Sequence, residues 1–406
     1  LGDQVGKTLR ITAENGTEFS VTELGGYTIQ AGSPTQVVNT GIVTDTYILE
    51  NGGDTITLEI EVLPIIGTAG DDSTIVEGND GNNVIDALAG NDTVSAKLGD
   101  DIIFAGAGAD TIYGDGGNDT LFVDSDYTAD ATANENDTYD GGTGEDTIQA
   151  SLVTDGVNID LNAQTLTDQS GGLNIGVDTI VSIEHVVGSG QGDDIRGSDA
   201  DDNTLIGGAG NDTIEGRDGA DYIEGGAGDD TIVLDDDGAD VDVLRGGAGG
   251  EDTLDLSVNM GTDNIDVDLS GTQTISTGDD IDGFEHVKGS DGDNILTGNA
   301  GDNTLDGQGG ADTFIGGDGS DVFIGGAGTD VADYAGTAAI NANLNTGNIT
   351  QGGDTDTITG VERVLATANN DTFQITDTDL AGMTAANFYD GRAGSDTLVI
   401  TGNLNF

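Results

Sequence analysis

A nine-residue period in glycine constrains this chain more than any other feature of its sequence. Residues 78–122 divide without gaps into five nonapeptides, and the same period returns over residues 207–233 and 289–333. Single copies begin at Gly141, Gly188 and Gly391. Self-similarity at a short fixed period indicates a repeat architecture, in which each unit buries its apolar face only by stacking on its neighbours.

The columns of the repeat predict a turn followed by a short strand. Positions one, two and four favour glycine, position six is Asp or Asn, and position eight is aliphatic or Phe, with a lone Ala332. Glycine readily takes positive φ, so the first half of each repeat can form a tight turn. The last three residues, such as Thr-Ile-Tyr, form a strand whose middle side chain faces one side.

We expect two nonapeptides to close one coil, so that residues 18 apart lie above one another near the strand spacing of about 4.8 Å. Position six would then form columns along the molecule. The predicted stacked pairs are Asp92 with Asp110, Asp101 with Asp119, Asp212 with Asp230, Asp312 with Asp330, and Asn303 with Asp321.

The charge of the chain makes such columns unfavourable unless a cation intervenes. Acidic side chains number 77 against 9 basic ones, for a net charge of −68. Two carboxylates about 5 Å apart repel by about 3 kcal/mol at an effective dielectric of about 20. Ca2+ binds six to eight oxygens, and the absence of cysteine and the presence of only two histidines disfavour softer metals.

The column pattern matches GGxGxDxUx, so the chain resembles the repeats-in-toxin (RTX) family of hemolysin-type calcium-binding nonapeptide proteins. The resemblance implies multiple Ca2+ ions in the turns and export by a type I secretion system. The predicted fold is all-β: a parallel β-roll, or β-solenoid, in three runs with β inserts. The predicted metal ligands are Asn83, Asp92, Asp101, Asp110, Asp119, Asp146, Asp193, Asn203, Asp212, Asp221, Asp230, Asp252, Asn294, Asn303, Asp312, Asp321, Asp330 and Asp396.

The apolar content of 34% and aromatic content of 4% are low for a chain that folds on its own. We therefore predict that the rolls are largely unfolded without Ca2+ and fold as it binds. Tyr113 and Tyr222 flank position eight and should be exposed. The predicted core is Ile85, Val94, Ile103, Ile112, Leu121, Leu205, Ile214, Ile223, Ile232, Leu305, Phe314 and Phe323.

The segment before the repeats contains both prolines, Pro34 and Pro64, and alternates like strands. It predicts a small β-sandwich-like cap that ends in a hairpin around Asn51. This hairpin is similar, over about 20 residues, to the closing strands of cadherin-like or immunoglobulin-like adhesin modules. The predicted domains are 1–66, then three units of roll plus β insert at 67–187, 188–288 and 289–406.

The inserts recur, with two strand-like stretches and then an Ile/Phe/Val-Glu-His/Arg-Val strand. We expect them to continue the solenoid with wider turns, separate globular domains being the alternative. His185 and His286 share this context with Arg363, which favours a polar position on a strand over catalysis. Neither HExxH nor GxSxG occurs, and no carboxylate pair is singled out for glycoside hydrolysis, so we predict no catalytic residues and no enzyme.

These features favour a secreted, calcium-rigidified structural protein of the bacterial cell surface or matrix, such as a surface-layer, fibre or adhesin component. The alternative is the non-catalytic carboxyl-terminal RTX region of a larger type I-secreted enzyme or toxin. Expected partners are Ca2+, other copies of the chain, assembled end to end or laterally, and cell-surface polysaccharide, although Phe and Tyr are dispersed and form no evident sugar platform. The charge argues against nucleic acid, and no apolar run is long enough to span a membrane.

Overall fold

The computed structural model describes the backbone of six strands between residues 7 and 62. It then describes residues 64–401, apart from 73–74, 124–135, 170–174, 235–240, 259–263, 271–272, 337 and 377–387. Every regular element in these described ranges is a β-strand, and no helix among them is long and apolar enough to cross a membrane. The protein is therefore all-β in its described part, as predicted.

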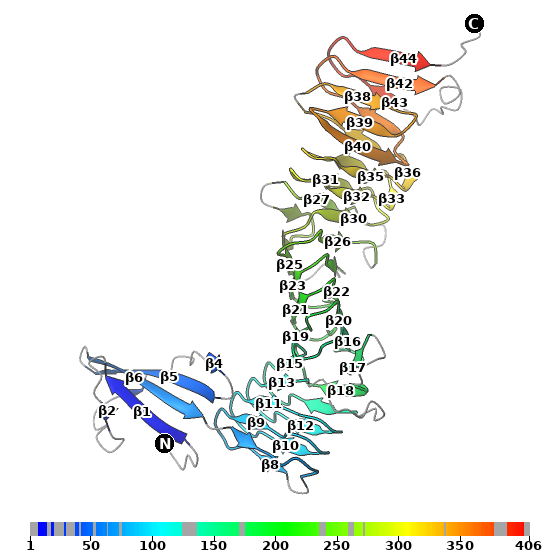
Figure 1. The fold of residues 1–406 in the computed structure, drawn as a ribbon. Coiled ribbons are helices and arrows are strands. Elements are labelled where there is room, and N and C mark those ends of the chain that lie inside the picture. The colour runs from blue at the N-terminus through cyan, green and yellow to red at the C-terminus, as the bar shows by residue number, and fades with distance from the viewer. Residues whose placement is uncertain are drawn as a thin grey trace. The chain divides into compact units, whose positions relative to one another are not determined.

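Contacts divide the chain into two compact units, residues 1–152 with 172–183, and residues 153–171 with 184–406. Figure 1 shows the strands of each unit stacked in successive layers. The division into four domains made from the sequence stays a prediction.

The amino-terminal segment forms one antiparallel sheet in its described residues, in the order β2-β1-β6-β5-β3, with β4 paired to β5. The predicted hairpin is confirmed, because Asn51 lies opposite Asp54 in the β5–β6 pair. The described strands thus account for one sheet of the predicted sandwich-like cap. Its strands are β1 (Lys7–Ala13), β2 (Glu18–Phe19), β3 (Thr28–Ile29), β4 (Val37–Asn39), β5 (Ile42–Asn51) and β6 (Asp54–Val62).

The first unit continues as a roll of two parallel ladders, with successive nonapeptides alternating between them. Thr111 pairs with Thr93 and Thr120 with Ile102, each 18 residues apart, so two nonapeptides form one coil as predicted. One ladder is β8 (Val76–Glu77), β10 (Thr93–Ser95), β12 (Thr111–Tyr113), β14 (Thr138–Asp140) and β18 (Val177–Val181). The other is β7 (Ile65–Ile66), β9 (Val84–Asp86), β11 (Ile102–Phe104), β13 (Thr120–Phe122) and β15 (Thr147–Gln149).

The second unit repeats this arrangement with longer ladders. The longest contains β16 (Val157–Asp160), β20 (Asp194–Arg196), β22 (Thr213–Glu215), β24 (Thr231–Val233), β26 (Thr253–Asp255), β30 (His286–Lys288), β32 (Thr304–Asp306), β35 (Val322–Ile324) and β40 (Asp354–Thr359). A second contains β19 (His185–Val187), β21 (Thr204–Ala209), β23 (Tyr222–Ala227), β25 (Val243–Gly247) and β29 (Asp280–Asp282).

Two further ladders complete this unit. One contains β27 (Asp266–Asp268), β31 (Ile295–Thr297), β34 (Thr313–Ile315), β37 (Val331–Asp333), β41 (Arg363–Leu365) and β43 (Phe388–Asp390). The other contains β38 (Ile340–Asn343), β42 (Thr372–Thr376) and β44 (Thr397–Thr401). Two glycine-turn strands, β33 (Gly309–Gly310) and β36 (Ala327–Gly328), also pair in parallel.

The inserts continue the solenoid. In the second insert, β29 extends the ladder of β25, and β30 joins β26 to β32. Each insert adds an antiparallel strand beside the ladder, namely β17 (Thr165–Asp168) on β16, β28 (Thr274–Ile275) on β27, and β39 (Asn348–Gln351) between β38 and β40. The wider turns expected of the inserts are these hairpins.

Position eight forms the core, as the repeat predicts. All of the position-eight residues predicted from the sequence are at most 1% exposed. Phe314 and Phe323, from β34 and β35, stack with ring centroids 5.5 Å apart. Tyr113 and Tyr222 are exposed, as expected.

Candidate metal centre

Position six forms continuous columns inside the roll. Along a column, the Oδ1 atom of one position-six carboxylate accepts a hydrogen bond from the backbone N–H of the position-six residue one coil earlier; at Asp193 the donor is the N–H of Val157 instead. The predicted stacks are confirmed by these bonds, from Asp92 to Asp110, Asp101 to Asp119, Asp212 to Asp230, Asp312 to Asp330 and Asn303 to Asp321, at 2.7–2.9 Å. We call each such row of side chains a position-six column.

The column side chains are buried. Of the eighteen predicted ligands, all lie in the interior except Asp396, which is exposed although its Oδ1 accepts the N–H of Asp371. These are therefore not the solvated turn aspartates that the repeat alone also allows. Since an unpaired buried charge is costly, each column needs a compensating group.

The second carboxylate oxygen shows where a compensating group would bind. The buried Oδ2 atoms of Asp92, Asp119, Asp212, Asp230, Asp312 and Asp330 accept no hydrogen bond. Oδ2 points towards the position-one glycine of its own repeat, and a Cβ added to Gly114 or Gly207 would collide with the Oδ2 of Asp119 or Asp212. Glycine at position one thus leaves room beside the carboxylate.

Burial changes the acidity of the columns. Burial, together with neighbouring carboxylates, raises the pKa of Asp119, Asp212, Asp312 and Asp321 to about 7, although backbone hydrogen bonds oppose the shift in part. A carboxyl with a pKa near neutrality is one whose charged form lacks sufficient stabilisation. A bound cation would supply it.

These residues fit Ca2+. The groups available are carboxylate oxygens in buried rows beside carbonyl-rich glycine turns, and Ca2+ takes oxygen ligands of both kinds. No cluster of three or more His, Cys, Asp or Glu side chains occurs in the ranges that the structure describes. Turn carbonyls would therefore have to supply most of the remaining ligands.

The columns include residues that the nonapeptide search missed. Asp137, Asp178, Asp242, Asp279, Asp356 and Asp371 accept column hydrogen bonds at separations of 21 to 41 residues. Their signal in the sequence is an Asp two residues before an aliphatic or aromatic residue. Glu285 and Glu362 end columns in the same way, with Oε2 accepting the N–H of Asp252 and Asp330.

The recurrent Glu-His-Val strands have a place in the ladders. Nδ1 of His185 accepts the N–H of Thr204 at 3.1 Å, and Nδ1 of His286 accepts that of Thr304 at 2.9 Å. In the third insert, Arg363 lies over the ring of Phe388 at 5.5 Å. All three side chains therefore contact the following coil, which supports the strand-face interpretation.

The contacts between coils also explain why some repeats have asparagine, and not aspartate, at position six. Nδ2 of Asn203 donates to the carbonyl of Glu184, and Nδ2 of Asn303 to that of Glu285, each at 2.8 Å. A carboxylate cannot donate such a bond. At Asn203 and Asn303 the preceding coil therefore belongs to an insert that presents a carbonyl, whereas Nδ2 of Asn294 donates to Oγ of Ser290 in its own turn.

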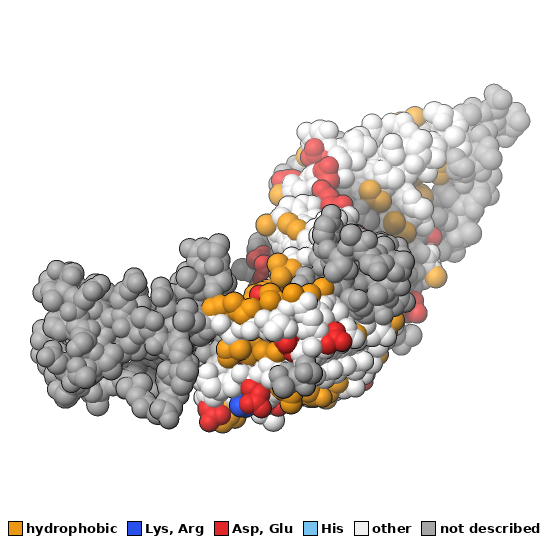
Figure 2. All heavy atoms as spheres, turned by 60° about the horizontal axis from the view of Figure 1, so that its bottom comes forward, with side chains coloured by type: hydrophobic (Ala, Val, Ile, Leu, Met, Phe, Trp, Pro, Cys, Tyr) orange, Lys and Arg blue, Asp and Glu red, His pale blue; other side chains and the backbone are white. Residues whose placement is uncertain are grey.

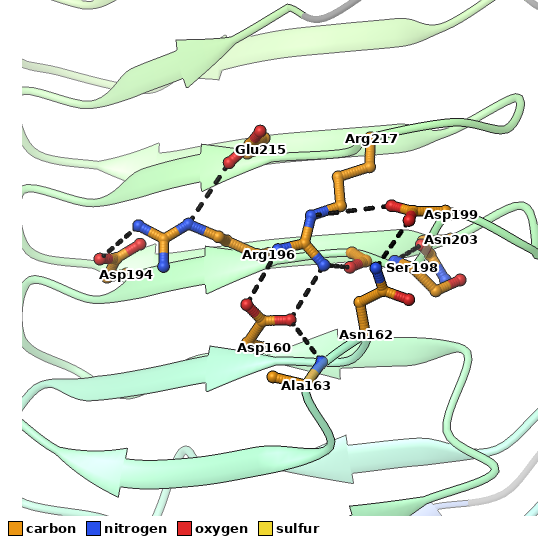
Figure 3. Close-up of polar contacts among 11 residues, drawn as sticks. Asp160, Asn162, Ala163, Asp194, Arg196, Ser198, Asp199, Asn203, Glu215 and Arg217 are labelled. Atoms are coloured by element: carbon orange, nitrogen blue, oxygen red, sulfur yellow. Dashed lines mark hydrogen bonds and ion pairs between the residues drawn. The ribbon is translucent and has the colours of Figure 1, made fainter.

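The scarce basic side chains join coils. Arg217 makes two bonds of 2.9 Å to the carboxylate of Asp160 and one to the carbonyl of Gly197, while Arg196 contacts Asp194 and Glu215 (Figure 3). Burial acts to raise the pKa of Asp160, but the hydrogen bonds from Arg217 and Ala163 and the nearby arginine charges together outweigh it, and the pKa lies below its usual value. On the face drawn in Figure 2, basic groups are scarce and acidic ones recur.

The parallel ladders and the buried position-six columns define the class of this protein. It is a parallel β-roll built from nonapeptides of the calcium-binding type. The family model described as the RTX calcium-binding nonapeptide repeat matches residues 66–103, 96–127, 133–151, 197–232, 279–314 and 300–332. The chain carries RTX calcium-binding nonapeptide repeats, as the sequence predicts.

Similarity to known whole proteins is weak. No curated protein matches the chain. Among solved structures, the extracellular lipase LipA from Serratia marcescens is similar at 17% identity, with a TM-score of 0.17. The match covers 71% of this chain and 40% of the lipase chain, so this chain spans less than half of that protein's length.

Proposed function

We propose that this chain is a secreted structural protein whose rolls fold and become rigid when they bind Ca2+. The observation that carries the proposal is the set of buried Oδ2 atoms that accept no hydrogen bond. A fold that buries carboxylates in this way is stable only when their charge is neutralised. Binding energy from the cation then contributes directly to folding.

The location proposed is the cell exterior, at the bacterial surface or in its matrix. RTX repeats are typical of type I secretion substrates, and extracellular calcium modules have Kd values of about 10⁻⁴ to 10⁻³ M. A chain with sites of this kind would stay unfolded inside the cell and fold outside it. We favour a structural role without catalysis because the described side chains mainly make contacts between successive coils.

Far-UV circular dichroism of the full chain tests the folding step. At neutral pH in chelator we expect a largely disordered spectrum, and excess Ca2+ should convert it to a β-spectrum. Mg2+ at the same concentration is the control, because its strict octahedral preference suits these sites poorly. Full β-structure in chelator at neutral pH would contradict the proposal.

The surface role needs a separate measurement. Antibody labelling of intact cells should detect the chain outside the cell, and a chelator wash should release it or change its protease sensitivity. Label confined to the cytoplasm would refute this part. Sedimentation velocity with and without Ca2+ tests self-assembly, and a glycan array in calcium buffer tests binding to surface polysaccharide.

A further inference from the structure

The turns of the roll fall into two classes that differ at position two. In the first class, here called closed turns, the N–H of the position-two residue donates to the position-six side chain of the same repeat. In Ser290, for example, the N–H bonds to Oδ1 of Asn294 at 3.0 Å. The closed turns are Thr68 to Asp72, Asn79 to Asn83, Ser189 to Asp193, Ser198 to Asn203, Ser290 to Asn294, Asn299 to Asn303 and Thr367 to Asp371.

The second class, here called open turns, has a left-handed residue at position two. Leu88, Asp115, Gly208, Gly226, Gln308 and Gly326 have φ between 63° and 116°. In the same repeats, Oδ2 of Asp92, Asp119, Asp212, Asp230, Asp312 and Asp330 accepts no hydrogen bond. None of the position-two residues of the closed turns has positive φ.

The side chain at position two accounts for the difference. Ser, Thr and Asn bond to backbone N–H groups two residues ahead, which holds a turn at negative φ. The N–H of Gln191 donates to Oγ of Ser189, that of Gly292 to Oγ of Ser290, and that of Gly301 to Oδ1 of Asn299. Every closed turn has one of these three residue types at position two.

Asp115 shows that an Asp or Asn side chain at position two does not by itself close a turn. Its turn is open, with φ of 71°. The carboxylate of Asp115 instead accepts bonds from Oγ of Ser95 and the N–H of Lys97 in the preceding coil. The local bond that closes a turn is therefore absent where the side chain bonds to another coil.

Six of the seven closed turns, all but that of Thr367, occur in pairs where a run of repeats begins. Thr68 lies before the first run and Asn79 in its first repeat, Ser189 and Ser198 precede the second run, and Ser290 and Asn299 begin the third. Because two repeats form one coil, each run begins with one coil whose turns are both closed. The position-six oxygens of that coil already have donors from their own backbone.

We infer that position two decides whether a turn takes Ca2+. The closed coil that starts each run satisfies its position-six oxygens without the ion, and Ca2+ enters the open turns that follow. The inference rests on the proposed calcium-dependent function and refines it. It removes Asn83, Asp193, Asn203, Asn294 and Asn303 from the ligands that the repeat pattern predicts.

The test converts a closed turn into an open one in the full chain. Ser290→Gly with Asn294→Asp gives this repeat the sequence of an open turn, and equilibrium dialysis against radioactive Ca2+ should show one more bound ion per chain than in the unmodified protein. Asn294→Asp alone is the matched control. It adds the carboxylate but keeps the N–H and hydroxyl of Ser290, so we expect no additional ion.

Two outcomes would overturn the inference. A gain of an ion in Asn294→Asp alone would show that charge at position six decides, and no gain in the double variant, folded in calcium by circular dichroism, would show that position two does not. Ser189→Gly supplies a second site where Asp193 is already acidic, and it should also gain one ion. If the unmodified chain binds no Ca2+, the proposed function fails instead.

Discussion

At the scale of single residues, the lysines and arginines of the described roll each contact an acidic or aromatic side chain. Lys97 pairs with Glu77, Lys288 with Asp255 and Arg392 with Asp333. With so few cations, these pairs leave most of the negative charge uncompensated. Their contribution is local, because each fixes one coil or hairpin to another.

Among these ion pairs, we predict the largest effect on stability for the pair of Arg217 and Asp160. The side chain of Arg217 is 17% exposed and that of its partner, Asp160, is 21% exposed, so solvent screens the pair only partly. Arg217→Ala should lower the free energy of unfolding in excess Ca2+ by about 1–2 kcal/mol, measured by urea denaturation. The hairpin of β16 and β17 should then exchange its amide hydrogens faster.

Arg245→Ala is the control for this prediction. Arg245 bonds to Asp280, whose side chain is 62% exposed, so the loss should be below about 1 kcal/mol. Equal losses in the two variants would contradict the role assigned to Arg217.

At the scale of the coil, close backbone stacking requires glycine at position four. Gly228 has φ of 139°, and a Cβ there would collide with the carbonyl oxygen of Gly210 in the preceding coil. The repeat keeps this glycine because backbones of successive coils touch at the turn. The neighbouring position-six column depends on the same spacing.

Gly228→Ala should therefore destabilise the calcium-bound roll by more than about 2 kcal/mol, from the left-handed backbone and the collision together. The midpoint of thermal unfolding in excess Ca2+ measures it. Gly190→Ala is the matched control, because Gly190 has no heavy atom near its Cβ direction and no positive φ. A similar midpoint for both variants would mean that the coils can separate at little cost.

At the scale of the whole molecule, the raised pKa values of the position-six columns make the calcium-free fold sensitive to pH. Burial raises the pKa of Asp119, Asp212 and Asp312 from 3.8 to about 7. Between these values the folded state binds more protons than the unfolded state, so the stability of the calcium-free fold falls as pH rises towards about 7. Below about pH 4 the penalty disappears, and above about 7 it is complete.

We therefore expect acid to replace Ca2+ in part. In chelator, circular dichroism should show more β-structure at pH 5 than at pH 8, whereas with excess Ca2+ the two spectra should agree. Identical spectra at both pH values in chelator would show that the columns do not control folding.

The repeat determined much of this fold because its contacts lie at one constant separation. Eighteen residues bring Asp92 beside Asp110 and Thr93 beside Thr111, so the coil, the core column and the acidic columns all follow from the period. The oxygen-rich composition of the columns likewise indicated Ca2+. Each of these properties is local or periodic, and the sequence by itself was sufficient.

Only the tertiary structure decided the contacts whose separation varies. Asp137 and Asp178 join their column across 41 residues, and Arg217 reaches Asp160 across 57, because hairpins of different length intervene. Whether a position-six oxygen accepts a hydrogen bond from the backbone of its own turn, or Oδ2 stays without a donor, also depends on the φ of the position-two residue. A side chain such as Asp115 can bond within its turn or to the preceding coil, and the sequence of one repeat does not contain the geometry that selects between them.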